Sequence, residues 1–256
     1  MEHTVLITGA TAGFGEATAR RFLSHGHQVI AVGRRIERLN ALKASLPESQ
    51  KAKLLTMVVD VCDSAKVDNL AASLPAEFAN VTVLVNNAGL ALGLEPAHKA
   101  SLSDWDRMID TNIKGLVHMS RAFLPGMVER KCGHIINVGS VAGLYPYPGS
   151  NVYGSTKAFV KQFSLNLRAD LIGTPLRVTC VEPGLSSGTE YSNVRFKGDD
   201  AKAEKVYEGV QALSADDIAE AIYWSATLPP HMNINALEVM PVQQSFAGTT
   251  IHRGEL

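Results

Sequence analysis

Cysteine is scarce in this chain, and the few cysteines are not spaced as pairs. The 256 residues include three of them, Cys62, Cys132 and Cys180, an odd number with long separations. Disulfide frameworks and cysteine-based zinc sites need closely spaced or even-numbered cysteines. We therefore expect no disulfide framework and no metal site, as is typical of proteins in the reducing cytoplasm.

Long apolar runs and an excess of charge of one sign are also missing. No run approaches the roughly 18 apolar residues of a membrane span, and the formal net charge is −1. The chain passes from Met1 almost directly into a strand-like pattern, without the basic and apolar regions of a signal peptide. These features argue against a nucleic-acid or membrane partner and predict a cytoplasmic protein.

What the sequence does contain is a regular alternation of short β-branched runs with longer helical patterns. The runs are nearly continuous in apolar residues, which a parallel sheet buried on both faces requires. The predicted strands are Val5–Thr8, Gln28–Gly33, Leu54–Asp60, Val81–Asn86, Gly133–Gly139, Leu176–Glu182 and Leu237–Pro241. The predicted helices are 13–24, 36–45, 64–74, 105–129, 151–172 and 215–227. This pattern predicts an α/β fold, a Rossmann-type doubly wound parallel sheet of about seven strands with helices on both faces.

One long irregular stretch interrupts the alternation, and nothing in the composition divides the chain. The stretch runs from Pro183 to about Asp200 and is rich in Gly, Ser and charged residues. Long structureless loops in compact domains are often lids over a site. We expect a single domain over 1–256, with a lid at about 184–210 and a tail at 242–256.

A glycine-rich turn follows the first predicted strand and leads into a helix. Glycines there let backbone N–H groups approach a pyrophosphate at the positive end of the helix dipole. The predicted phosphate turn is Gly9, Ala10, Thr11, Ala12, Gly13, Phe14 and Gly15. Its G-x-x-x-G-x-G spacing departs from the common dinucleotide fingerprint and indicates a variant family.

The end of the second predicted strand indicates which dinucleotide binds. An NAD site typically has a carboxylate there for the ribose 2′-hydroxyl, whereas this chain has Arg34 and Arg35. Guanidinium groups match the geometry of a 2′-phosphate, so the pair predicts NADP(H); the alternative is two solvated arginines. Further cofactor contacts are expected at the ends of the next two strands, from Asp60, Val61, Asn87, Ala88 and Gly89.

The most specific chemical pattern is Tyr153-Gly-Ser-Thr-Lys157. Residues four apart share one helix face, and a cation about 4 Å from a phenol contributes roughly 4 kcal/mol at an effective dielectric of ~20. Such a cation would lower the phenol pKa by up to about three units, toward the range useful for acid–base catalysis. Ser140, at a strand end, is placed to hold a substrate oxygen, and Asn112 falls inside a predicted helix, where Asn is disfavoured.

Together these motifs resemble the short-chain dehydrogenase/reductase family over nearly the whole chain. The resemblance implies that Tyr153 transfers the proton, that Ser140 positions the carbonyl and that Asn112 orders a water. It also implies that Lys157 binds the nicotinamide ribose, that Tyr153, Pro183 and Gly184 contact the cofactor, and that the protein is a homotetramer. Taken singly, each motif has a simpler structural explanation, such as a solvated Tyr–Lys pair on a helix or a serine at a strand end. Their combination is what makes coincidence improbable.

Segments at 89–99, 151–159, 188–199 and 233–235 resemble a narrower group, the bacterial NADP-dependent 3-hydroxy acid dehydrogenases. The resemblance implies L-allo-threonine, serine or malonic semialdehyde as substrates, and sulfoacetaldehyde reductases are near relatives. Such anionic substrates need a cation, and Arg195 is the only arginine of the predicted lid. We expect Arg195 to bind the substrate anion, with Ser140, Tyr147 and Tyr191 lining the same pocket. The alternatives are a lid arginine in solvent or at a subunit contact, and tyrosines that only pack.

Two other functions remain open from the sequence. A reductase of 3-oxoacyl thioesters on acyl carrier protein would use the same catalytic residues. A sensor that binds NADP without catalysis belongs to a different class, and such proteins usually lack part of the Ser–Tyr–Lys set. The presence of the whole set favours an enzyme that interconverts a short 3-hydroxy acid or hydroxy sulfonate and its aldehyde or keto form.

Overall fold

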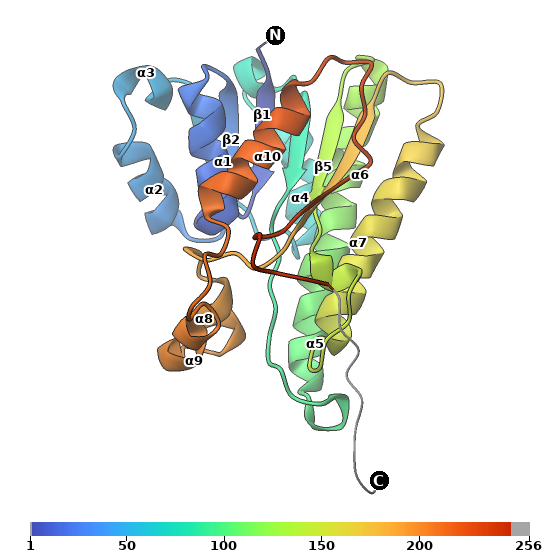
Figure 1. Cartoon of the computed structure of the whole chain (residues 1–256). Coiled ribbons are helices and arrows are strands. Elements are labelled where there is room, and N and C mark those ends of the chain that lie inside the picture. Colours follow the sequence, from blue (N-terminus) through green and yellow to red (C-terminus); the bar gives the residue numbers. More distant parts are fainter. Residues whose placement is uncertain (1, 247–256) are drawn as a thin grey trace, which may run out of the picture.

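One parallel sheet forms the centre of the molecule (Figure 1). The computed structural model describes residues 2–246, and within that range seven strands pair in the order β3-β2-β1-β4-β5-β6-β7. The strands are β1 (Thr4–Thr8), β2 (Gln28–Gly33), β3 (Leu54–Val58), β4 (Val83–Asn86), β5 (His134–Val138), β6 (Arg177–Pro183) and β7 (Ala236–Val239). Every neighbouring pair is parallel. The predicted doubly wound sheet is confirmed, and each strand boundary lies within two residues of its prediction.

The central strands are buried on both faces, which explains their continuous apolar sequence. Every residue of β1, β4, β5 and β6 is buried, whereas the edge strands β3 and β7 carry partly exposed positions. A parallel sheet needs a helical layer on each side to achieve this burial.

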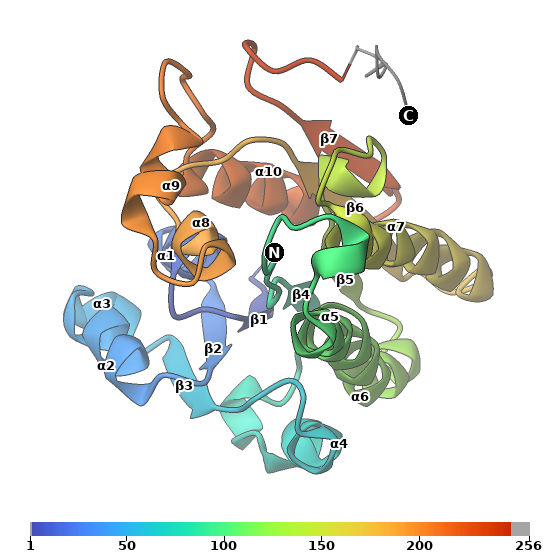
Figure 2. The same ribbon diagram turned by 90° about the horizontal axis from the view of Figure 1, so that it is seen from below.

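Two layers of helices cover the sheet (Figure 2). The longer helices are α1 (Gly13–Ser24), α2 (Ile36–Ala44), α4 (Ser64–Ser73), α5 (Leu102–Ile109), α6 (Leu116–Glu129), α7 (Asn151–Asp170) and α10 (Ala215–Thr227). Helices α1, α2 and α10 supply apolar residues to one face, and α4, α6 and α7 supply the other. Shorter helical segments are α3 (Glu48–Lys51), η1 (Ala76–Phe78), η2 (Ala97–Lys99) and η4 (Val141–Gly143).

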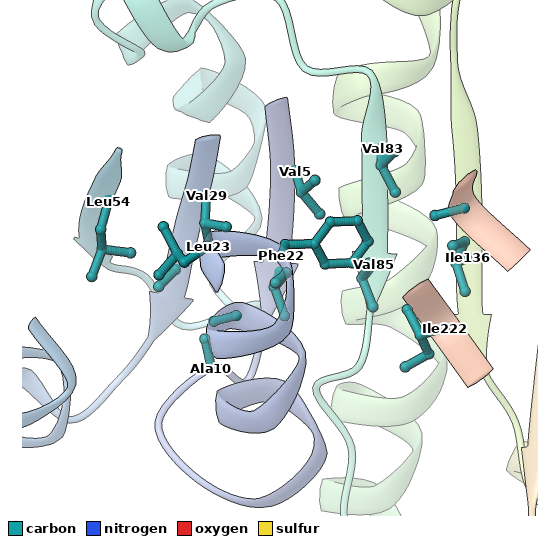
Figure 3. Packing of buried hydrophobic residues seen from close by; sticks show 14 of the residues in the cluster. Val5, Ala10, Phe22, Leu23, Val29, Leu54, Val83, Val85, Ile136 and Ile222 are labelled. Carbon is teal, nitrogen blue, oxygen red and sulfur yellow. The ribbon is translucent and has the colours of Figure 1, made fainter. Parts of the chain in front are cut away.

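Phe22 of α1 lies at the centre of the first layer (Figure 3). Its side chain is fully buried in the cluster that contains Val5, Val85 and Ile222, so one aromatic ring joins α1, the sheet and α10. Burying a phenylalanine side chain contributes about 1.5–3 kcal/mol. This packing fixes α1, whose first residues, Gly13 to Gly15, complete the predicted phosphate turn.

The helix predicted at 105–129 is wrong in two respects. It begins three residues earlier, at Leu102, because the Ser101 hydroxyl caps it by accepting a hydrogen bond from the Asp104 backbone N–H at 3.4 Å. It is also not one α-helix, because a wider π-helical turn, η3 (Asp110–Gly115), separates α5 from α6. Such turns occur frequently at functional sites.

The predicted lid is only partly irregular. It contains two short helices, α8 (Tyr191–Arg195) and α9 (Asp200–Lys205), which lie beyond the carboxyl ends of the strands (Figure 1). The expectation of a structureless loop is therefore wrong. Of the predicted tail at 242–256, positions 247–256 lie outside the described residues. Within 2–246, no helix has the length and apolar character needed to cross a bilayer.

Candidate active site

A cavity of about 670 Å³ opens between the carboxyl ends of the strands and the lid. Small-molecule sites have this size, and in doubly wound sheets they lie where the strand order reverses, here between β1 and β4. The predicted cofactor residues lining it are Gly9, Thr11, Ala12, Gly13, Phe14, Arg34, Arg35, Asp60, Val61, Asn87, Ala88, Gly89, Pro183 and Gly184. The predicted catalytic and substrate residues lining it are Ser140, Tyr147, Tyr153, Lys157, Tyr191 and Arg195.

Three predicted site residues do not line the cavity. Ala10 is fully buried in the core, and Gly15 is buried beneath the phosphate turn. Asn112 is 1% exposed and lies behind the wall formed by Gly89 and Leu90. These residues can shape the site, but in this structure they do not touch its interior.

The phosphate turn needs its glycines for conformation and for space. Gly9 has φ +68°, a left-handed conformation that favours glycine, and Gly13 has φ +51°. A Cβ on Gly15 would overlap the carbonyl oxygen of Gly9. At its glycines the turn therefore presents bare backbone at the amino end of α1.

Hydrogen bonds between Thr8 and the segment after β4 hold this turn in place. The Thr8 hydroxyl accepts hydrogen bonds from the backbone N–H groups of Asn87 and Ala88, at 3.0 and 2.9 Å. The Asn87 amide donates to the carbonyl oxygen of Thr8 at 2.8 Å. The two strand ends at the point of reversal are thus locked together, which keeps the cavity floor rigid.

The two arginines after β2 reach the rim of the cavity beside the phosphate turn. Arg35 donates from Nη2 to the Thr11 hydroxyl at 3.1 Å and pairs through Nη1 with Glu190 at 2.8 Å. Arg34 Nη1 lies 3.6 Å from a carboxylate oxygen of Asp60. Both arginines line the cavity, and their binding of a 2′-phosphate stays a prediction.

Tyr153 and Lys157 lie on the buried face of α7, as the i,i+4 spacing predicts. Lys157 Nζ donates to the carbonyl oxygen of Val138 at 2.8 Å and lies 6.0 Å from the centroid of the Tyr153 ring. The Ser140 hydroxyl accepts from the Ala142 N–H at 3.1 Å. Ser140, Tyr153 and Lys157 thus meet at the carboxyl end of β5.

The predicted effect of Lys157 on the phenol is wrong in this structure. The pKa of Tyr153 is raised, not lowered, because burial penalises the phenolate, and hydrogen bonding with Tyr191 and Ser140 only partly offsets this. The pKa of Lys157 is itself lowered to about 8 by burial. Lys157 extends past the phenol and donates to the Val138 carbonyl oxygen of β5. The two side chains therefore share a helix face without forming a hydrogen bond with each other.

Asn112 is buried within the π-helical turn, and its side-chain hydrogen bonds join two segments of the chain. Its amide N–H₂ donates to the Leu90 carbonyl oxygen at 2.9 Å and to the Thr156 hydroxyl at 3.0 Å, and its oxygen accepts from the Leu90 N–H at 2.9 Å. It therefore joins the segment after β4 to α7. A Cβ on Gly89 would lie 3.2 Å from the Asn112 oxygen and 3.4 Å from Lys157 Nζ, so Asn112 lies close to Lys157.

Arg195 is the buried cation of the lid. It is 9% exposed, donates to the Tyr147 hydroxyl at 3.0 Å and to the Gly93 carbonyl oxygen at 3.2 Å, and its Nη2 has no hydrogen-bond partner among residues 2–246. Its guanidinium carbon lies 5.4 Å from the Tyr147 ring centroid and 5.8 Å from that of Tyr153. Over the described range it forms no ion pair with a carboxylate, so its charge is uncompensated beside the phenol.

The lid and the segment after β7 also contribute residues that the sequence does not assign to the site. Thr189 packs against the phosphate turn, since a Cβ on Gly13 would lie 3.1 Å from its side chain. Glu190 pairs with Arg35, and Lys197 pairs with Asp104 of α5 at 2.7 Å. Gln244 lines the cavity from the far end of the chain. Adjacency to Tyr191 could have suggested the first two, but no sequence signal points to Gln244.

Residues 3–200 match the sequence model of the short chain dehydrogenase family. The chain belongs to this family. The match covers the phosphate turn, the Tyr153–Lys157 pair and most of the lid, and it agrees with the fold found here.

Relatives of this short-chain dehydrogenase share both sequence and structure along almost its whole length. It is 63% identical to the NADP-dependent 3-hydroxy acid dehydrogenase YdfG of Escherichia coli K12, over 97% of this chain and 99% of the relative. It is 50% identical to serine 3-dehydrogenase of Agrobacterium fabrum, over 99% of each chain. A solved structure of the closed form of serine dehydrogenase complexed with NADP+ superposes with a TM-score of 0.94 at 63% identity, covering 98% of this chain and 99% of the other.

Proposed function

We propose that this short-chain dehydrogenase uses NADP(H) to interconvert a short 3-hydroxy acid and its aldehyde or keto form. The observation that carries the substrate class is Arg195, a buried guanidinium without a carboxylate partner, 5.8 Å from the Tyr153 ring. A buried charge is costly unless it is paired, so an anionic group on the substrate would complete this site. The names of the relatives support the same substrate class.

The residues of the cavity fit NADP(H). Backbone N–H groups at the amino end of α1 suit a pyrophosphate, in a turn where a Cβ on Gly15 would overlap backbone. Arg34 and Arg35 suit a 2′-phosphate, and Asp60 and Val61, which line the same cavity, are the residues we assign to the adenine. When bound, the reduced nicotinamide supplies the hydride that goes to the carbonyl carbon.

The proton transfer is assigned to Tyr153. In the reducing direction its hydroxyl gives a proton to the carbonyl oxygen as the carbon gains the hydride with its electron pair, so the product is a neutral alcohol. The raised pKa of the buried phenol keeps that proton on Tyr153 at neutral pH, as a general acid requires. Ser140 would orient the substrate oxygen, and Lys157, held by the Val138 carbonyl oxygen, would bind the cofactor ribose.

The acid group of the substrate is assigned to Arg195, with Tyr147 and Tyr191 beside it. A guanidinium binds a carboxylate or a sulfonate through parallel N–H donors. Malonic semialdehyde and sulfoacetaldehyde therefore both suit the site, and so do serine and L-allo-threonine as alcohols. The homotetramer stays a prediction from the family resemblance, consistent with the partly exposed Phe159 and Leu165 on α7.

A comparison of substrates in wild type and Arg195→Ala tests this function. We expect the substitution to lower kcat/KM for malonic semialdehyde about 10- to 100-fold, because a charge-assisted hydrogen bond contributes about 1.5–3 kcal/mol, with little change for propanal, which has no acid group. NADPH binding should stay unchanged. Arg121→Ala, which alters an exposed arginine on α6, is the matched control.

Other results would point to other functions. Equal losses for malonic semialdehyde and propanal would contradict the role of Arg195, and faster turnover of an acetoacetyl thioester than of short acids would favour the acyl-carrier-protein reductase. A Tyr153→Phe variant that oxidised NADPH as fast as wild type would contradict catalysis by the phenol and favour a sensor.

A further inference from the structure

Glu190 of the lid carries a carboxylate that bridges two arginines at the start of α2. One oxygen lies 2.8 Å from Arg35 Nη1, and the other accepts from Arg38 Nη2 at 3.0 Å. All three side chains are partly exposed, so the cluster lies at the rim of the cavity. Glu190 is also the residue directly before Tyr191, which packs on the catalytic phenol.

This carboxylate uses donors that the proposed 2′-phosphate would need. Arg35 reaches the phosphate turn through the Thr11 hydroxyl, so its position there is set by the turn and not by the lid alone. Carboxylates and phosphates bind guanidinium groups through the same planar N–H donors. The lid therefore places an anion of the chain where an anion of the cofactor is expected.

We propose that Glu190 competes with the 2′-phosphate of the cofactor for Arg35 and Arg38, and so limits the affinity for NADP(H) relative to NAD(H). The inference rests on the proposed use of NADP(H). Binding of the 2′-phosphate breaks the ion pairs of Glu190 and brings the phosphate close to the Glu190 carboxylate, which has the same sign of charge. NAD(H) has a 2′-hydroxyl instead, so its binding requires neither change. Arg38 becomes a third phosphate-binding residue, one helical turn beyond Arg34 and Arg35.

The competition has a consequence for turnover. Tight binding of a dinucleotide slows its release, and product release or lid opening limits many enzymes of this kind. If the Glu190 carboxylate re-forms its ion pairs with Arg35 and Arg38 as the cofactor leaves, it assists that release. Glu190 thereby links the lid to the phosphate end of the cofactor, and its neighbour Tyr191 links the lid to the catalytic end.

The test is calorimetric binding to wild type and Glu190→Gln, which keeps the shape of the side chain and removes its charge. We expect the Kd for NADPH to fall about three- to tenfold, because exposed ion pairs each contribute modestly, and the Kd for NADH to stay the same. Adenosine 2′,5′-bisphosphate should reproduce the gain without the nicotinamide, and 5′-AMP should not. High salt should reduce the gain, because exposed charges are screened.

Two further variants make the test specific. Glu204→Gln removes an exposed carboxylate from α9 of the same lid, one without an ion pair among residues 2–246, and should leave the Kd for NADPH unchanged. Arg38→Met should weaken NADPH and not NADH.

The competition is overturned if Glu190→Gln binds NADPH no more tightly than wild type, or if it gains equally for NADH. Those results leave the proposed cofactor intact. A wild-type chain that binds NADPH no better than NADH would instead refute the cofactor assignment itself, so the two failures are distinguishable.

Discussion

At the residue scale, the Tyr153–Lys157 pair shows what spacing does and does not determine. The i,i+4 interval places both side chains on one face of α7, and the structure confirms this. It does not determine what each side chain touches: Lys157 donates to the Val138 carbonyl group of β5, and burial raises the pKa of the phenol. The lysine therefore does not activate the tyrosine by direct contact here.

The raised pKa of Tyr153 leads to a prediction about pH. The proposed oxidation of a hydroxy acid would use the Tyr153 phenolate as the base, and well below the pKa the phenolate fraction rises about tenfold per pH unit. We expect kcat/KM for oxidation to rise steeply between about pH 6 and about pH 8, because the raised pKa keeps Tyr153 mostly protonated there. Reduction, which needs the protonated phenol, should vary little over the same range.

Steady-state rates in both directions on one buffer series provide the measurement. Tyr153→Phe should abolish the slope together with most of the activity. An oxidation rate that does not depend on pH while the chemical step limits turnover would contradict the assignment of Tyr153 as the base.

At the element scale, the π-helical turn gives Asn112 its role. Asn is disfavoured within a helix, yet the sequence pattern predicts one continuous helix at 105–129. The wider turn, η3, is a response to tertiary contacts: the Asn112 side chain satisfies both backbone groups of Leu90 and reaches Thr156 on α7. Local periodicity carries no information about such distant partners.

Replacing Asn112 should therefore damage stability as well as activity. Asn112→Ala leaves the buried N–H and C=O groups of Leu90 without partners, and each unsatisfied group costs about 1–3 kcal/mol. We expect urea unfolding to show a loss of about 2–4 kcal/mol, with a lower kcat. Asn166→Ala, an exposed position on α7 whose amide oxygen bonds only to Gln162, is the control and should change stability by less than about 0.5 kcal/mol. A fully stable Asn112→Ala variant would show that the hydrogen bonds of the Asn112 side chain do not stabilise the fold.

At the scale of the whole molecule, the two ends of the parallel strands carry different groups. The cavity lies at the carboxyl ends, whereas His3, His27 and His134 lie near Arg177 at the amino ends. His3 donates its backbone N–H to His27 Nδ1 at 3.1 Å, and His134 Nε2 lies 2.8 Å from the Thr179 hydroxyl. Burial lowers the pKa of all three, that of His3 to about 4.

These histidines predict a loss of stability in acid. Their pKa values are lower in the folded state than the ordinary 6.5, so the unfolded chain binds more protons as the pH falls below 6.5. The stabilisation is complete above that pH and is lost toward about pH 4, where His3 itself becomes protonated. Allowing for its partial exposure, we expect about 1–2 kcal/mol from His3.

Urea unfolding at a series of pH values measures this loss. His3→Gln should flatten the pH dependence between about pH 6.5 and about pH 4, whereas His98→Gln, at an exposed position in η2, should not. An unchanged slope in His3→Gln would exclude His3 as a source of the acid sensitivity.

The sequence by itself determined that the sheet is parallel and doubly wound. It also determined where the phosphate turn lies and which structural elements carry Ser140, Tyr153 and Lys157. Each depends on short-range rules, namely apolar periodicity, glycine conformation and residues placed at strand ends, and parallel strands bring those ends to one edge. Only the tertiary structure decided the direction of the Tyr153 pKa, the π-helical turn at Asn112 and the pairing of Glu190 with Arg35. Those depend on burial and on contacts between residues up to 155 positions apart (190 − 35), which no local pattern encodes.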